Sequence, residues 1–165
     1  MRLNKNTKVL ILGSIVSPVP PLKQGGTEWV AYYQAVGLSM KGLKIVLIGA
    51  VGTSTNFENQ VKREFPDKYK SVLRNIKIVE IGGGTGAGNQ ADSLNVDLAQ
   101  SESSRKLRME MVYLAQVLQY LKDKKSSYDV VINNMRGEAI LLPLLKELKK
   151  KVMCVLHLNL FSELG

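Results

Sequence analysis

The sequence is poor in cysteine and histidine, with one of each among its 165 residues. A single cysteine excludes an internal disulfide and a cysteine-rich zinc site, so we expect a reducing compartment. The apolar run around Cys154, KVMCVLH, predicts a small buried thiol rather than a nucleophile. No cluster of metal ligands and no Walker lysine motif is present in the sequence. We therefore expect no metal and no cofactor.

Long apolar runs are also missing, and none approaches the roughly 18 residues that a transmembrane helix needs. The N-terminal segment MRLNKNTKVLILG has basic residues before a short apolar run, as a secretory signal does. Glycine and prolines interrupt the run, and no cleavage site of small residues follows. The segment therefore predicts a first buried strand, and we expect a cytoplasmic protein.

Acidic residues are in deficit, because 14 Asp and Glu stand against 23 Lys and Arg and leave a net charge of +9. A positive field of this kind favours phosphorylated ligands, anionic lipid surfaces or nucleic acid. A lysine-rich solvated surface explains the charge equally well. The charge alone therefore does not identify a partner.

Short β-branched runs recur along the chain, and each is followed by a helical pattern. The expected strands are residues 8–13, 44–50, 76–81, 129–133 and 152–157, and the expected helices are residues 27–41, 58–73, 104–122 and 138–150. The strands are continuous apolar runs, as in parallel sheets that are covered on both faces. The alternation predicts an α/β fold with a Rossmann-like, doubly wound and mainly parallel sheet, in a single domain over residues 1–165.

The expected helix at residues 104–122 has the clearest apolar stripe, at spacings of three and four: Leu107, Met111, Leu114, Ala115, Leu118 and Leu121. Such a stripe predicts packing against the core. The polar stretch before it contains GGGTGAG at residues 82–88, which formally matches the dinucleotide fingerprint, with Glu102 at the expected distance downstream. That fingerprint needs a helix that begins within it, whereas NQADS delays any helix. A flexible loop is the better interpretation.

The stretch SIVSPVPPLKQGGTEWV links the first expected strand to the first expected helix. Open parallel sheets bind ligands beyond the carboxyl ends of their strands, and this stretch follows such an end. Gly25 and Gly26 allow a ligand to approach the backbone closely, and Thr27 is the expected N-cap of the helix. Free amides and the helix dipole then favour an anion. An ordinary strand-to-helix connection is the alternative.

Polar residues follow two later strands at the same edge of the expected sheet. His157 ends the last apolar run, and Asn134 ends the run before it, with Arg136 and Glu138 just beyond. A lone histidine is more often structural than catalytic. Its place at the carboxyl edge nevertheless makes His157 a candidate site residue.

The stretch SPVPPLKQGGTEWVAYYQAVGLSMKGLKIVLIGA resembles the opening of the retaining glycosyltransferases of family four, which have the GT-B fold. The family pattern is a strand, a proline-containing loop, Gly-Gly-x-Glu, an amphipathic helix, Gly-His-x-Val and a second strand. The matching residues are Val19, Pro20, Pro21, Gly25, Gly26, Glu28, Val30 and Gly42-Leu43-Lys44-Ile45, where Leu43 replaces the histidine. Later, YDVVINN resembles the Asp-Val-Val-His-x-His strand, and KVMCVLH resembles the strand that ends in Thr-x-His.

The resemblance implies the N-terminal, acceptor-side domain of a two-domain enzyme. Such enzymes move a sugar from a nucleotide diphosphate sugar to a carbohydrate or lipid-linked acceptor, with retention at the anomeric carbon. By this resemblance Gly25 and Gly26 face the donor's diphosphate. The candidate substrate-binding residues are Gly25, Gly26, Thr27, Glu28 and Arg136, and the candidate catalytic residues are Asn134 and His157.

The chain departs from the family at three site positions. Asn134 stands where the family has a functionally important histidine, Ile132 takes the other histidine position, and Val155 replaces the threonine. Asparagine cannot act as a general base, but it can form a hydrogen bond with a sugar hydroxyl. The C-terminal domain, which holds most donor contacts in this family, is not in these 165 residues. We therefore expect this chain alone to bind donor weakly and to turn over little.

Many relatives act at membranes, and four lysines suit peripheral docking at the inner membrane face: Lys146, Lys149, Lys150 and Lys151. They also fit a solvated helix end, and no nucleic-acid partner is expected. Two alternatives to the transferase remain. One is a nucleotide- or phosphate-binding Rossmann-like module that uses residues 82–88, and the other is one half of a split enzyme that pairs with a separate chain.

Overall fold

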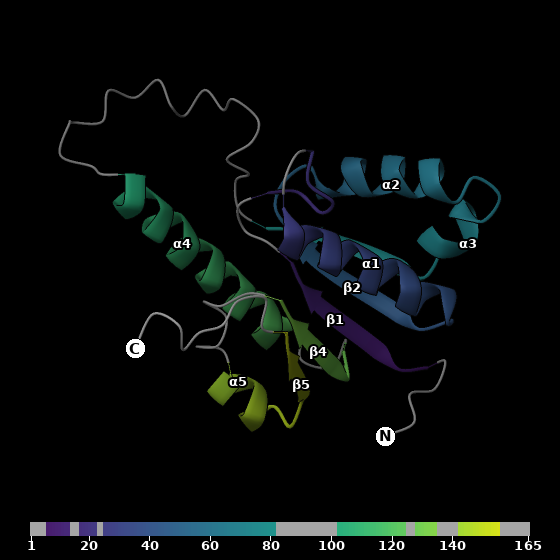
Figure 1. Ribbon diagram of the computed structural model, residues 1–165. Helices are drawn as coiled ribbons and strands as arrows, with labels where there is room; N and C mark the ends of the chain where they lie inside the picture. The colour runs from purple at the N-terminus through teal and green to yellow at the C-terminus, as the bar shows by residue number, and fades with distance from the viewer. Residues whose placement is uncertain are drawn as a thin grey trace, which may run out of the picture.

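The computed structural model describes residues 6–13, 17–22, 25–81, 102–124, 128–134 and 142–155, with the side chains of residues 102–110 excepted (Figure 1). Strands and helices alternate along these residues. The strands are β1 (Lys8–Leu12), β2 (Lys44–Gly49), β3 (Ile76–Glu80), β4 (Val130–Asn133) and β5 (Lys151–Cys154). The helices are α1 (Gly26–Met40), α2 (Thr53–Glu64), α3 (Tyr69–Leu73), α4 (Glu102–Asp123) and α5 (Leu142–Glu147).

The five strands form one parallel sheet in the order β3-β2-β1-β4-β5. β1 lies at the centre, where Leu10 is in register with Val46 of β2 on one side and with Val131 of β4 on the other. The strand order runs outward in one direction from β1 to β3 and then reverses to β4. In open parallel sheets, the crevice at such a reversal is where ligands bind.

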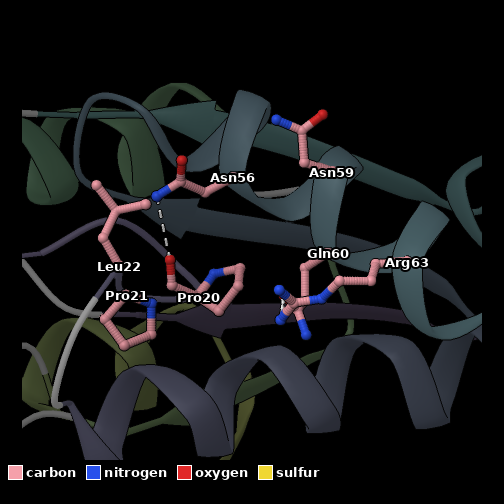
Figure 2. Close-up of a pocket in the computed structure, with 7 residues that line it drawn as sticks. All are labelled: Pro20, Pro21, Leu22, Asn56, Asn59, Gln60 and Arg63. Atoms are coloured by element: carbon pink, nitrogen blue, oxygen red, sulfur yellow. Dashed lines mark hydrogen bonds between the residues drawn. The ribbon is translucent and has the colours of Figure 1, made fainter.

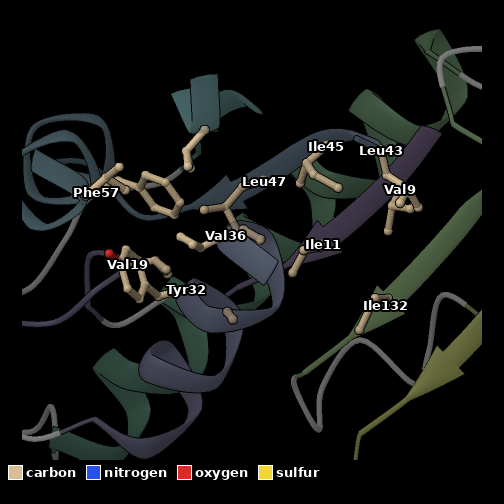
Figure 3. Packing of buried hydrophobic residues seen from close by; sticks show 14 residues of the cluster. Val9, Ile11, Val19, Tyr32, Val36, Leu43, Ile45, Leu47, Phe57 and Ile132 are labelled. Atoms are coloured by element: carbon tan, nitrogen blue, oxygen red, sulfur yellow. The ribbon is translucent and has the colours of Figure 1, made fainter. Parts of the chain in front are cut away.

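Alternate residues of β1 point into two separate cores. Val9 and Ile11 belong to a cluster that includes residues of α1, α2 and α3, part of which Figure 3 shows. Leu10 and Leu12 belong to a second cluster that includes residues of α4 and α5. Helices therefore cover both faces of the sheet, and the α/β, Rossmann-like and doubly wound prediction is confirmed.

Strands β1 to β4 lie within one residue of their predicted bounds, whereas one predicted helix is divided. The pattern at residues 58–73 predicts one helix, but the structure has α2 up to Glu64 and α3 from Tyr69. Pro66 lies between them, and proline lacks the N–H that a continuous helix needs. α2 also begins earlier than predicted, at Thr53. The last predicted helix is described only from Leu142 onward.

The predicted stripe on α4 is partly wrong. Tyr113, Leu114, Val117 and Leu121 are buried, whereas Met111 is 56% exposed. Ala115 is exposed as well, and the side chain of Leu107 lies outside the described residues. The Tyr113 hydroxyl donates a hydrogen bond to the carbonyl of Gly13 (3.2 Å), which fixes the face that α4 turns toward the sheet. The helix is therefore rotated relative to the leucine and methionine pattern.

The buried position predicted for Cys154 is wrong, because this thiol is exposed. Cys154 lies on β5, which pairs only with β4 and forms an edge of the sheet. Met153 beside it is also 58% exposed. In the described part of the chain, no helix has the length and apolar character to cross a bilayer.

Gly37 offers a test of the packing of α1, because a Cβ built there meets no atom within 4 Å. Alanine restricts the unfolded chain more than glycine and favours the helix. We expect Gly37→Ala to raise the free energy of unfolding by about 0.5–1 kcal/mol in urea titrations. A loss of stability would contradict the open space that the structure gives this position.

Candidate functional site

The loop after β1 is fastened to α2 through its backbone. We call residues 18–22 the proline loop. The N–H of Val19 donates to Thr53 Oγ1 (3.1 Å), and the Thr53 hydroxyl donates to the carbonyl of Ala50 (2.6 Å). Asn56 Nδ2 donates to the carbonyl of Pro20 (3.3 Å). The first two turns of α2 therefore fix the path by which the chain reaches α1.

The first turn of α1 has no side-chain cap. Thr27 is predicted as the N-cap, but the N-cap is Gly25, and among the described residues no side chain caps the helix terminus. The first helical hydrogen bond runs from the N–H of Trp29 to the carbonyl of Gly25 (3.1 Å). The turn into the helix thus occurs at the glycines, so Thr27 already has helical geometry. An uncapped terminus leaves amide N–H groups available to a ligand.

The two glycines at this terminus have different surroundings. A Cβ at Gly25 would lie 2.6 Å from Glu28 Oε2 and 2.8 Å from Cγ of Pro21, so only glycine fits there. A Cβ at Gly26 would meet no atom within 4 Å, and Gly26 is exposed. Gly25 is therefore required by packing, whereas Gly26 presents open backbone.

Glu28 folds back over the start of its own helix. The residue is 8% exposed, and its Oε2 lies against Gly25. A carboxylate in the first turn is favoured by the positive end of the helix dipole. It accepts hydrogen bonds but cannot donate them when ionised. Glu28 therefore suits a ligand hydroxyl, and an anion would approach from the side of Gly26.

Asn134 carries an unpaired buried oxygen. The residue is 2% exposed, and its Nδ2 donates to Gln34 Oε1 (2.8 Å) and to the carbonyl of Leu12 (3.4 Å). Because a carbonyl can only accept, the amide must turn its nitrogen toward Leu12 and its Oδ1 away. In the part of the chain that the structure describes, Oδ1 of Asn134 is the one buried side-chain polar atom without a hydrogen-bond partner. Such an atom costs about 1–3 kcal/mol of stability.

Asn134 and α1 meet at the strand-order reversal. Asn134 directly follows β4, and its N–H points to the carbonyl of Leu12 at the end of β1 (3.4 Å). Its bond to Gln34 ties it to α1, the helix that begins at Gly26. The structure thus places the predicted residues Gly25, Gly26, Thr27, Glu28 and Asn134 on the segments that follow β1 and β4. Arg136, His157 and residues 82–88 lie outside the described residues.

Sequence reasoning missed Thr53 and Gln34, which hold the proline loop and Asn134. Thr53 had a readable signal, because it follows β2 in the motif Gly-Thr-Ser at the same carboxyl edge. Gln34 had none, since it lies within a helix and its partner is 100 residues away. Over residues 6–155, apart from the gaps given above, no group of three His, Cys, Asp or Glu side chains could hold a metal ion.

Thr53 can be tested by removing its hydroxyl. Thr53→Val keeps the shape but leaves the buried N–H of Val19 without its acceptor, so we expect a loss of about 1–3 kcal/mol in unfolding free energy. Thr53→Ser keeps the hydroxyl and should lose less. A smaller loss in urea unfolding for Thr53→Val than for Thr53→Ser would show that the methyl group, rather than the hydrogen bonds, holds the loop.

No protein family, curated protein or solved structure matches this chain. The functional assignment therefore depends on the site geometry and on the motif resemblance.

Proposed function

We propose that this chain is the acceptor-side half of a retaining glycosyltransferase of the GT-B type. It moves a sugar from a nucleotide diphosphate sugar to a carbohydrate or lipid-linked acceptor. The observation that carries the proposal is that two places with unused hydrogen-bonding groups lie at the same edge of the sheet. They are the uncapped first turn of α1, where Gly26 is exposed, and the buried Oδ1 of Asn134.

The donor's diphosphate is assigned to the first turn of α1. Gly26 is exposed, and a Cβ placed there meets no atom of the described residues within 4 Å. Free N–H groups and the helix dipole attract an anion there. A departing nucleotide diphosphate gains negative charge in the transition state, so fixed amides stabilise the transition state more than the bound donor.

Asn134 and Glu28 are assigned to hydroxyl groups. The Oδ1 of Asn134 is buried in this structure, so donor binding must first expose it. It then accepts a hydrogen bond from a sugar hydroxyl, which satisfies the one buried acceptor that is unpaired among the described residues. The Glu28 carboxylate lies beside Gly25 and can accept from a second hydroxyl. Neither residue needs to move a proton in these roles.

The reaction exchanges one bond at the anomeric carbon for another. The bond from that carbon to the donor's phosphate oxygen breaks, and the acceptor's hydroxyl oxygen bonds to the carbon on the same face. The hydroxyl proton leaves with the nucleotide diphosphate, whose phosphate oxygen gains the electron pair of the broken bond. A second α/β domain is proposed to supply the remaining donor contacts. Roles for Arg136 and His157 stay predictions.

Cytoplasmic location with peripheral contact at the inner membrane face also stays a proposal. Of the four lysines considered for docking, Lys150 is engaged within the protein. Its Nζ donates to the carbonyl of Tyr128 (2.6 Å) and lies 4.8 Å from the centre of the Tyr128 ring. The exposed residues Lys146, Lys149 and Lys151 are the remaining candidates.

Gly26→Trp tests the diphosphate site. The indole would fill the open space over the helix terminus, so we expect binding of UDP and UDP-glucose to be lost in saturation-transfer NMR. Gly37→Trp is the matched control, because its Cβ also meets no atom and lies on the same helix far from the terminus. Binding that is equally strong in wild type and Gly26→Trp would remove the terminus from the site.

Asn134→Leu tests the sugar contact. Leucine removes the unpaired acceptor but also the two hydrogen bonds that Nδ2 donates to Gln34 and Leu12, so the free energy of unfolding should fall by about 1–3 kcal/mol. We expect the affinity for UDP-glucose to fall about five- to tenfold, until it equals the affinity for UDP. The affinity for UDP itself should not change. An equal loss for both ligands would mean that Asn134 acts only through the fold.

A further inference from the structure

A second site lies between the proline loop and α2. A pocket of about 230 Å³ is lined by Pro20, Pro21, Leu22, Asn56, Asn59, Gln60 and Arg63 (Figure 2). The proline loop supplies an apolar wall, and α2 supplies four polar side chains. Pro21 also packs against Gly25, so the pocket adjoins the first turn of α1.

The exposed residue Arg63 gives the pocket a positive charge that has no ion-pair partner among the described residues. Nη2 of Arg63 donates to Gln60 Oε1 (2.6 Å), and no carboxylate of the described residues forms an ion pair with Arg63. The next residue back along α2 is different, since Lys62 pairs with Glu58 at 2.6 Å. Most N–H donors of the Arg63 guanidinium therefore remain available to a ligand.

A hydrogen-bond chain from the core orients Arg63. Gln60 Nε2 donates to Glu64 Oε1, and the Tyr32 hydroxyl donates to Glu64 Oε2 (3.0 Å). Because a carboxylate only accepts, Gln60 must turn its nitrogen to Glu64 and its oxygen to Arg63. Tyr32 is fully buried, and burial and the Glu64 carboxylate raise its pKa, so its hydroxyl keeps its proton. Glu64 is thus engaged by these donors and does not pair with Arg63.

The remaining groups fit a polyhydroxylated ring. Asn56 is held by its bond to the carbonyl of Pro20, which leaves its Oδ1 as an acceptor. Asn59 is exposed and has no protein partner among the described residues. The rings of Pro20 and Pro21 and the exposed Leu22 can pack against the C–H face of a sugar. Amides for hydroxyls, an apolar wall and one guanidinium together select a sugar that carries an anionic group.

We propose that this pocket binds a sugar bearing a phosphate or carboxylate, with the anion on Arg63 and the ring against the prolines. The identity of this ligand as the acceptor rests on the proposed function: if the chain is a transferase, the anionic sugar is the acceptor, and Pro21 separates it from the first turn of α1. The binding of an anionic sugar itself does not depend on transfer.

The test is calorimetric titration of the chain with glucose 6-phosphate, glucose and inorganic phosphate. We expect glucose 6-phosphate to bind about tenfold more tightly than glucose or phosphate alone, because the two parts of the pocket act together. Arg63→Gln should lower the affinity for glucose 6-phosphate to that for glucose. Lys62→Gln, which removes a neighbouring charge that is already paired, should leave it within about twofold.

Several outcomes would overturn the proposal. Equal losses in the Arg63 and Lys62 variants would show diffuse attraction by the basic surface. Inorganic phosphate that binds as tightly as glucose 6-phosphate would show an isolated anion site. No binding of glucose 6-phosphate would exclude the site altogether. A second variant, Asn59→Glu, adds a negative charge at an exposed position and should weaken binding about tenfold without affecting the fold.

The two proposals can fail separately. Gly26→Trp should leave glucose 6-phosphate binding unchanged, because Gly26 does not line the pocket. Retained UDP-glucose binding in Gly26→Trp, with glucose 6-phosphate binding lost in Arg63→Gln, would reject the donor site and keep the pocket. The reverse pattern would reject the pocket and keep the donor site.

Discussion

The structure depends on a central strand that has no polar face. Val9, Leu10, Ile11 and Leu12 of β1 are all buried, and alternate residues point to opposite sides of the sheet. A strand of this kind is stable only when helices cover both of its faces. The chain must therefore change sides once, and it does so between β3 and β4, which places β4 beside β1. The connections after β1 and β4 then diverge, which leaves a crevice between them where a ligand can enter. The burial of the four β1 side chains therefore determines where this crevice lies.

The proline loop joins the two proposed subsites into one rigid arrangement. It is hydrogen-bonded to Thr53 and Asn56 of α2 on one side, and its Pro21 packs against the N-cap Gly25 on the other. The helix terminus and the pocket are therefore held at a fixed separation by one short segment. What marks both places is unsatisfied bonding capacity. At Gly26 and Arg63, both exposed, water occupies the free donors until a ligand replaces it, whereas the unpaired oxygen of Asn134 is buried.

The sequence predicted what depends on local pattern and missed what depends on pairing between distant segments. Continuous apolar runs identified the strands, and their alternation with helices identified the doubly wound fold. Whether Cys154 is buried depends on β5 being an edge strand, and strand order cannot be read from strand composition. The face of α4 depends on the bond between Tyr113 and Gly13, which are 100 residues apart. Because Gly25 and Gly26 precede Thr27, the sequence alone did not show which of these residues would cap α1. The break at Pro66, by contrast, was readable.

The charged residues show most clearly why the pairing of individual side chains matters more than the net charge. The net charge of +9 indicates a preference for anions but does not say where one would bind. Lys62 and Arg63 are adjacent on α2, yet only Lys62 has a carboxylate four residues before it on the same helix. Arg63 has Asn59 and Gln60 at the corresponding positions, and Asp67 follows only after α2 has ended at Glu64. Helix spacing alone therefore leaves Arg63 unpaired, whereas the engagement of Glu64 by Tyr32 and Gln60 becomes visible only in the fold.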